Sequence, residues 1–213
     1  PKVSQPNDVL ANDYLSKNNS IEKAAKQFVN YQVAKCTTSG FVTGLGGLIT
    51  LPVAIPANVS SVMYVQMRMI ACLAYMGGYD TSSDQVQTLV YACLAGISID
   101  QIIKQAGIKF GTKFTTAMVK KIPSTVLTKI NQKVGFRFLT KFAEKGIINI
   151  AKLVPVVGGV IGGGFDLVET KVIANRAYKM FIKGDLSALD DKDNEKIIDT
   201  AADIIKSQDE SDN

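Results

Sequence analysis

The two residues whose spacing comes closest to that of a catalytic pair are the carboxylates Asp166 and Glu169. They are three positions apart, so on a helix they share a face and are separated by one turn. Two carboxylates placed in this way can transfer protons or hold a divalent cation. No third carboxylate is close in the sequence, and a simpler role is to place negative charge at the N-terminal end of a helix dipole. We therefore expect no catalytic residue, no metal site and no cofactor, with an enzyme using Asp166 and Glu169 as a third-ranked alternative.

The amino-acid composition excludes several familiar enzyme classes, because the chain has no histidine among its 213 residues. Triads of the Ser-His-Asp and Cys-His types, HExxH peptidases and the usual zinc sites all need an imidazole. The three cysteines, Cys36, Cys72 and Cys93, form no CxxC pair, which predicts reduced, buried thiols. The first twenty residues are polar and lack the apolar segment of a secretory signal. These features predict a cytoplasmic protein.

A basic, amphipathic helix is the clearest candidate for binding. Between residues 124 and 145 a cation recurs every four residues, beside an apolar line repeated every three or four. Such a helix can pack or insert its apolar face while its cations contact phosphate groups. The alternative is the solvated outer face of an ordinary core helix. The residues predicted to contact an anionic lipid headgroup are Lys120, Lys121, Lys129, Lys133, Arg137, Lys141 and Lys145.

Charge is distributed unevenly along the chain, although the formal net charge is only +5. Residues 104–152 carry a net charge of +10, and residues 184–213 carry −7. This asymmetry predicts an anionic partner for the centre, either an anionic membrane surface or an acidic protein. The acidic tail either shields the centre or is simply solvated. Nucleic acid is disfavoured as a partner, because the central aromatic residues have core spacing and no RNA-binding motif surrounds them.

Two apolar segments rich in glycine and proline form a second candidate region. Residues 36–67 contain no charged side chain, but glycines and prolines interrupt them too often for one transmembrane helix. Residues 153–165 repeat the pattern. No Gly-Lys-Ser/Thr follows the first cluster, which excludes a P-loop. The glycines allow close helix packing, membrane insertion or both. The residues concerned are Gly40, Gly44, Gly46, Gly47, Pro52, Pro56, Pro155, Gly158, Gly159, Gly162 and Gly163.

These two segments and the helices after them resemble each other. Without gaps, Leu51–Met76 aligns with Val154–Lys179, and seven of 26 positions are identical. We interpret this as an internal repeat, which predicts two related helical halves about a pseudo-twofold axis.

The remaining pattern predicts an all-α fold, since no stretch shows the alternation of a strand. A polar arm over residues 1–19, a helical domain over 20–183 and an acidic tail over 184–213 are the expected units. The predicted helices cover residues 21–36, 58–75, 85–96, 100–110, 112–121, 124–145 and 190–206.

Four blocks of sequence together resemble a known family. They read GFVTGLGGLITLPVAIPANVSSVMYVQMRMIACLAYMGGYD, DQVQTLVYACLAG, KKIPSTVLTKINQKVGFRFLTKFAEKG and PVVGGVIGGGFDLVETKVIANRAYKMF. In this order they resemble the EcsC protein family over roughly residues 20–183. A weaker similarity is to the membrane-associated helical domain found beside some bacterial GTPases. The resemblance implies a bacterial-type, membrane-associated helical domain and supplies no catalytic residue.

The sequence thus favours a non-enzymatic helical protein that binds a membrane or lipid peripherally, at the inner face of the membrane. The basic helix would contact lipid phosphates, and the Gly/Pro-rich segments would insert or enclose acyl chains. The alternative is a soluble protein–protein interaction module that accompanies a transport or assembly complex.

Overall fold

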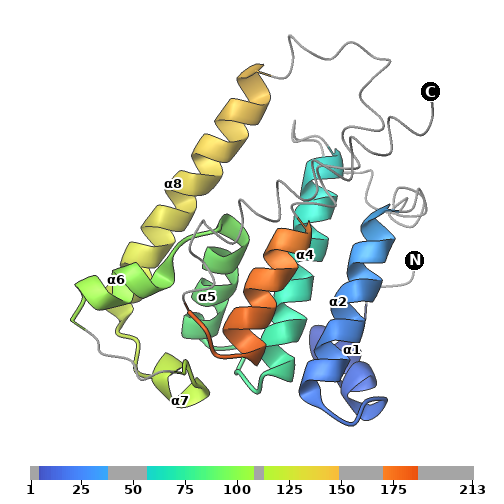
Figure 1. Cartoon of the computed structure of the whole chain (residues 1–213). Helices are drawn as coiled ribbons and strands as arrows, with labels where there is room; N and C mark the ends of the chain where they lie inside the picture. The colour runs from blue at the N-terminus through green and yellow to red at the C-terminus, as the bar shows by residue number, and fades with distance from the viewer. Residues whose placement is uncertain (1–4, 38–56, 108–112, 149–169, 187–213) are drawn as a thin grey trace, which may run out of the picture.

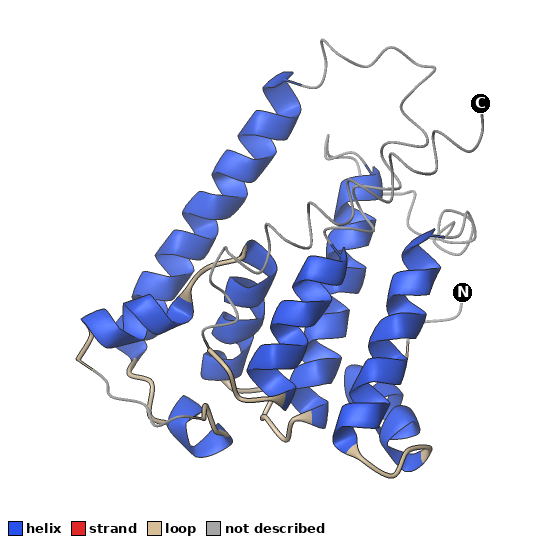
Figure 2. Ribbon diagram, viewed as in Figure 1, coloured by secondary structure: helices blue, strands red, loops and turns tan. Residues whose placement is uncertain are grey.

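The computed structural model describes residues 5–37, 57–107, 113–148 and 170–186, and every regular element in these ranges is helical (Figure 2). The all-α prediction is confirmed. Near the end of the described chain, residues 170–177 form an α-helix that continues as a π-helix over residues 178–182. The labelled elements are α1 (Asn7–Ser16), α2 (Ile21–Thr37), α4 (Ala57–Met76), α5 (Asp84–Ala95), α6 (Ile99–Gln105), α7 (Thr116–Val119), α8 (Ser124–Ile148) and η1 (Tyr178–Ile182). The predicted helix over 190–206 lies outside the described residues.

Serine side chains cap the N-terminal ends of two helices, α2 and α5. The Ser20 hydroxyl accepts a hydrogen bond from the Lys23 backbone N–H at 3.2 Å, at the start of α2. Ser83 does the same for the Val86 N–H at the start of α5. At the other end of α5, Gly96 adopts a φ of +68°, a conformation that glycine reaches without steric cost. These caps explain why α2 and α5 match their predicted bounds to within a residue or so, as α4 also does.

Three other predicted boundaries are wrong. The predicted helix over 100–110 ends at Gln105, and the one over 112–121 is reduced to the single turn Thr116–Val119. Phe114 explains the second difference, because its backbone N–H donates to the Gly184 carbonyl at 2.7 Å instead of joining a helix. By contrast, α8 runs through Gly146 to Ile148 rather than ending at residue 145.

The core is built around α4, which lies between α5 on one side and α1 and α2 on the other (Figure 1). Its Met69, Ile70 and Leu73 are buried against these neighbours. Arg68 is its only charged residue. Most of α5 is buried as well, as its nearly continuous apolar sequence predicts. The least charged part of the described chain is therefore its central core.

The two helices of the predicted repeat lie side by side. Near the start of the pair, the buried Gln66 side chain donates a hydrogen bond to the Thr170 hydroxyl at 3.1 Å. Near its end, Gly77 is so close to η1 that an added Cβ would lie 2.1 Å from the Phe181 carbonyl oxygen. Both contacts join residues 104 positions apart, so the helices are parallel and in register. This arrangement shows packing only, and a duplication of two halves stays a prediction.

An N-terminal helix was not predicted, since residues 1–19 were expected to be a polar arm. The sequence of α1 is only weakly amphipathic, yet α1 packs along α4. Its Ala11 is fully buried, and Asn12 donates a hydrogen bond to the Tyr75 hydroxyl at 3.1 Å. The small side chain of Ala11 permits this close approach, which no sequence periodicity signals.

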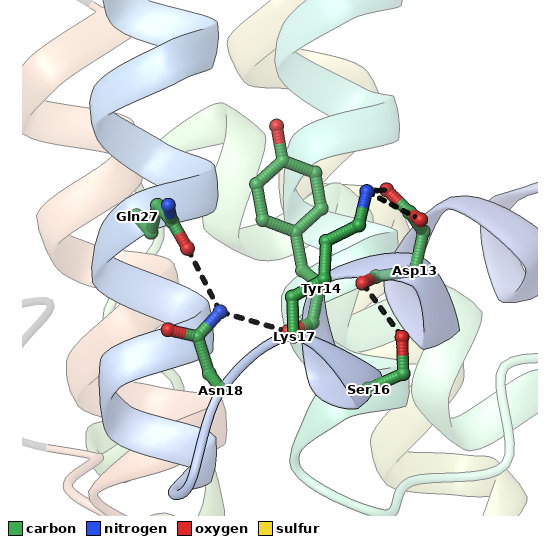
Figure 3. Close-up of polar contacts among 6 residues, drawn as sticks. All are labelled: Asp13, Tyr14, Ser16, Lys17, Asn18 and Gln27. Atoms are coloured by element: carbon green, nitrogen blue, oxygen red, sulfur yellow. Dashed lines mark hydrogen bonds and ion pairs between the residues drawn. The ribbon is translucent and has the colours of Figure 1, made fainter.

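Polar contacts fix the turn between α1 and α2 (Figure 3). The Asn18 side-chain amide donates both to the Tyr14 carbonyl at 2.9 Å and to the Gln27 side chain at 2.8 Å. Beside it, Lys17 forms an ion pair with Asp13 at 2.7 Å. These contacts hold α1 and α2 as a helical hairpin against α4.

Candidate functional site

The first half of α8 is anchored to the core by one apolar face. Leu127, Ile130 and Val134 are buried on this face, and α8 packs against α5 and α6. The Asn131 amide donates to the buried Thr88 hydroxyl of α5 at 3.4 Å. Side chains on the other faces of α8 are therefore positioned by a fixed helix.

The cations predicted for headgroup contact lie on this helix. Lys129, Lys133 and Arg137 are all exposed. Within the part of the chain that the structure describes, neither Lys129 nor Lys133 forms an ion pair. Lys141 and Lys145 also belong to α8, but their side chains lie outside the description. Both lysines at 129 and 133 thus offer their full charge to solvent.

The cations do not stay on one face of α8. At about 100° per residue, each four-residue step turns about 40° around the helix. Lys129 is therefore about 100° from the buried Ile130, whereas Arg137 is only about 20° from it. Arg137 is nevertheless exposed, whereas the next residue, Phe138, is partly buried against the core. Figure 1 shows the far end of α8 extending past α5.

An exposed aromatic residue lies on α8 beside the two lysines. Phe136 is 70% exposed, the highest value among the large hydrophobic side chains that the structure describes. It follows Gly135, and it points into the same sector of the helix as Lys129 and Lys133, within about 60° of either. Phe138 stays partly buried against the core. Phe136 thus adds an exposed apolar ring to the outer sector of α8 that carries the two lysines.

The two lysines before α8 have a different environment. Lys120 and Lys121 are exposed beyond the end of α7. Hydrogen bonds from the Ser82 side chain and backbone hold the pKa of Asp80 below its usual value, and the charge of Lys120 lowers it further. Lys120 is thus partly compensated by a carboxylate, unlike Lys129 and Lys133.

The other predicted site residues lie outside the described residues. The acidic pair is Asp166 and Glu169. The Gly/Pro-rich segments contain Gly40, Gly44, Gly46, Gly47, Pro52, Pro56, Pro155, Gly158, Gly159, Gly162 and Gly163.

The described cysteines show no sign of reactivity. Cys72 and Cys93 are buried and form no disulfide. Burial raises the pKa of each thiol to about 12, and only nearby arginines oppose this effect. Both therefore stay protonated at neutral pH.

The described ranges contain neither a membrane-spanning helix nor a cluster of metal-binding side chains. No helix there has the length and apolar character needed to span a bilayer. No group of three or more cysteine, aspartate or glutamate side chains gathers there as a possible metal site.

Fold and surface together define a class: an all-helical domain with an apolar core around α4 and an exposed basic helix. The family is given by comparison with known proteins. A model of the EcsC protein family matches residues 17–183, and the chain belongs to this family. The match begins after α1 and includes α8 and η1. No curated protein matches the chain. No solved structure matches it either.

Proposed function

We propose that the protein is a peripheral membrane-binding protein that acts by contact rather than by catalysis, and that the outer face of α8 meets an anionic leaflet. The observation that carries this proposal is the sector shared by Lys129, Lys133 and Phe136. The two cations lack ion-pair partners in the described part of the chain, and the aromatic ring beside them is largely exposed.

The electrostatic attraction between these cations and an anionic leaflet is large enough to measure. Each Lys or Arg near an anionic leaflet contributes about 1 kcal/mol, and the attraction falls off within about one Debye length. Lys129 and Lys133 together supply about 2 kcal/mol by this measure. Arg137, which lies on another sector of α8, adds to the local positive potential.

The apolar part explains why a membrane is favoured over an acidic protein surface. An interfacial helix buries an apolar face between headgroups and acyl chains while its cations stay at headgroup level. Phe136 supplies an exposed apolar ring in the same sector as Lys129 and Lys133. An acidic protein surface would pair with the cations, but it would offer no apolar environment to the exposed ring.

Vesicle flotation tests the proposal directly. The whole chain is mixed with vesicles of pure phosphatidylcholine or with vesicles containing anionic phosphatidylserine, at low and high salt. We expect binding to the anionic vesicles that weakens at high salt. Replacing Lys129 and Lys133 by Gln should lower the partition constant about 30-fold, which corresponds to about 2 kcal/mol.

The matched control is the double replacement Lys23→Gln and Lys26→Gln, which removes the same charge from exposed positions of α2. It should bind like the wild type, because these lysines lie on another helix. Phe136→Ala should reduce the binding that survives high salt. Failure of the wild type to bind anionic vesicles would overturn the membrane proposal and favour an acidic protein partner. Equal losses in both double variants would show that only total charge matters.

A further inference from the structure

A small pocket lies between α1, α4 and α5, apart from the outer face of α8. Its volume is about 170 Å³. Pockets for drug-sized ligands start at about 300 Å³, so only a small molecule fits here. The lining residues are Asn7, Tyr64, Met67, Arg68, Ala71, Thr81, Gln87, Val90 and Tyr91.

Arg68 gives the pocket a positive charge that is not balanced by its lining, since no lining residue is acidic. Among the described residues, its guanidinium makes one hydrogen bond, to the Gln5 carbonyl oxygen. Its Nε–H is buried and lacks a hydrogen-bond partner there. A guanidinium carries five N–H donors, and a buried donor without a partner is costly. Because Arg68 lines the pocket, an oxyanion bound there would bring the opposite charge to the guanidinium and acceptors for its N–H donors.

The rest of the lining indicates what accompanies the oxyanion. Met67, Ala71 and Val90 are apolar, and the rings of Tyr64 and Tyr91 are each 41% exposed at this surface. One guanidinium neutralises one negative charge, whereas phosphate carries more charge and offers no apolar part. A monocarboxylate with a short hydrocarbon chain matches both the single cation and the apolar wall.

We infer that this pocket binds a small organic monocarboxylate, with Arg68 as the anchor for the carboxylate and Met67, Ala71 and Val90 around the hydrocarbon part. The site is independent of α8 and does not rest on membrane binding. It adds a ligand-binding role for the α1–α4–α5 interface, which includes the N-terminal helix.

Arginine side-chain NMR gives a direct readout. The chain has only three arginines, Arg68, Arg137 and Arg176, so its Nε–H spectrum holds three side-chain signals to assign. The whole chain is titrated with acetate, propionate and butyrate, and with sodium chloride and inorganic phosphate at matched ionic strength. The Arg68 signal should shift saturably with the carboxylates. Each added CH₂ should tighten the Kd about fourfold while the pocket still has room.

Two variants and one control separate binding from folding. Arg68→Gln should weaken butyrate binding at least about tenfold, as expected for a lost charged hydrogen bond. Because this change also removes the bond to Gln5, Ala71→Leu provides a second test: it fills the pocket and leaves Arg68 in place. Lys171→Gln removes an exposed charge from another helix and should bind butyrate normally.

Several results would overturn the inference. One is the absence of any saturable shift at Arg68 in the folded wild type. Another is butyrate binding to Ala71→Leu with unchanged Kd, which would place the ligand elsewhere. A third is inorganic phosphate binding as tightly as butyrate, which would exclude a carboxylate-specific site. None of these outcomes affects vesicle binding through α8, so the two proposals fail separately.

Discussion

The two longest described helices, α4 and α8, differ most in how their sequences relate to their surroundings. Over 20 residues α4 carries one charge, and its Met69, Ile70 and Leu73 are buried in the core. Over 25 residues α8 carries several cations and is anchored to the core by its first half. Read alone, the apolar sequence of α4 suggests a membrane helix, but here its Met69, Ile70 and Leu73 belong to the core. The more polar α8 exposes Phe136 to 70%, against 41% for Tyr64 of α4.

This difference shows that the hydrophobicity of a helix does not by itself predict which of its side chains are exposed. The apolar helix α4 packs against α1, α2 and α5 and exposes Tyr64 to 41%, whereas the more polar α8 exposes Phe136 to 70%. The comparison can be tested by changing matched residues in the two helices.

The largest expected effect comes from truncating a buried side chain of α4. Leu73→Ala should lower the free energy of unfolding by about 2–5 kcal/mol, because it leaves a cavity in the core. Phe136→Ala on α8 should change it by less than about 0.5 kcal/mol, because the ring is largely exposed. Urea unfolding followed by far-UV circular dichroism measures both. A large loss for Phe136→Ala would mean that the ring is part of the core.

A pair of glycine substitutions sharpens the contrast. Gly77→Ala introduces a Cβ that would lie 2.1 Å from the Phe181 carbonyl oxygen, so the packing of α4 against η1 must shift. We expect a destabilisation of about 1–3 kcal/mol. Gly135→Ala places its Cβ in open space on α8 and should stabilise the protein by about 0.5–1 kcal/mol.

Thermal or urea unfolding of the two glycine variants gives the sign of each change. Opposite signs are the expected result. If Gly77→Ala proved neutral, the close parallel pairing of α4 and η1 would be wrong.

The smallest expected effect comes from removing the charge of Asp100, a carboxylate that stabilises the fold, in contrast to the exposed lysines of α8. Burial raises the pKa of Asp100, but hydrogen bonds from the Lys104 and Ser98 side chains outweigh this and lower it overall. A carboxyl whose pKa is lower in the folded state stabilises the protein above its unfolded pKa, and this contribution is lost as the pH falls through the folded pKa. Asp100→Asn should therefore cost a few tenths of a kcal/mol up to about 1 kcal/mol at pH 7.

The pH dependence of unfolding checks this prediction. The difference between the wild type and Asp100→Asn should shrink between about pH 5 and pH 2. Lys133→Gln is the comparison variant, since this lysine has no ion-pair partner in the described ranges, and it should leave stability nearly unchanged. A difference for Asp100→Asn that persists unchanged at low pH would assign its effect to something other than the carboxylate charge.

Local signals account for the parts of the fold that sequence reasoning predicted well. Ser20, Ser83 and Gly96 act on their own helix ends, so their positions alone predict where α2 begins and where α5 begins and ends. Long-range contacts account for the failures. Phe114 is held out of a helix by Gly184, 70 positions away, and α1 is stabilised by α4 rather than by its own periodicity.

The candidate site shows the same division. The four-residue spacing of Lys129, Lys133 and Arg137 was visible in the sequence, and so was the apolar line beside it. The exposure of Phe136, next to core-facing residues that include Val134 and Phe138, depends on how α8 packs against α5. The pocket at Arg68 had no sequence signal, because its walls come from three helices and from residues as far apart as Asn7 and Tyr91.

Sequence by itself determined the helical class, the capped helix ends, the family and the uneven charge, because each depends on residue types and on spacing within a few turns. Tertiary structure alone decided which apolar faces are buried and which are left outward. Those choices depend on contacts between residues far apart in the chain, where a single small side chain such as Ala11 or Gly77 sets how closely two helices approach.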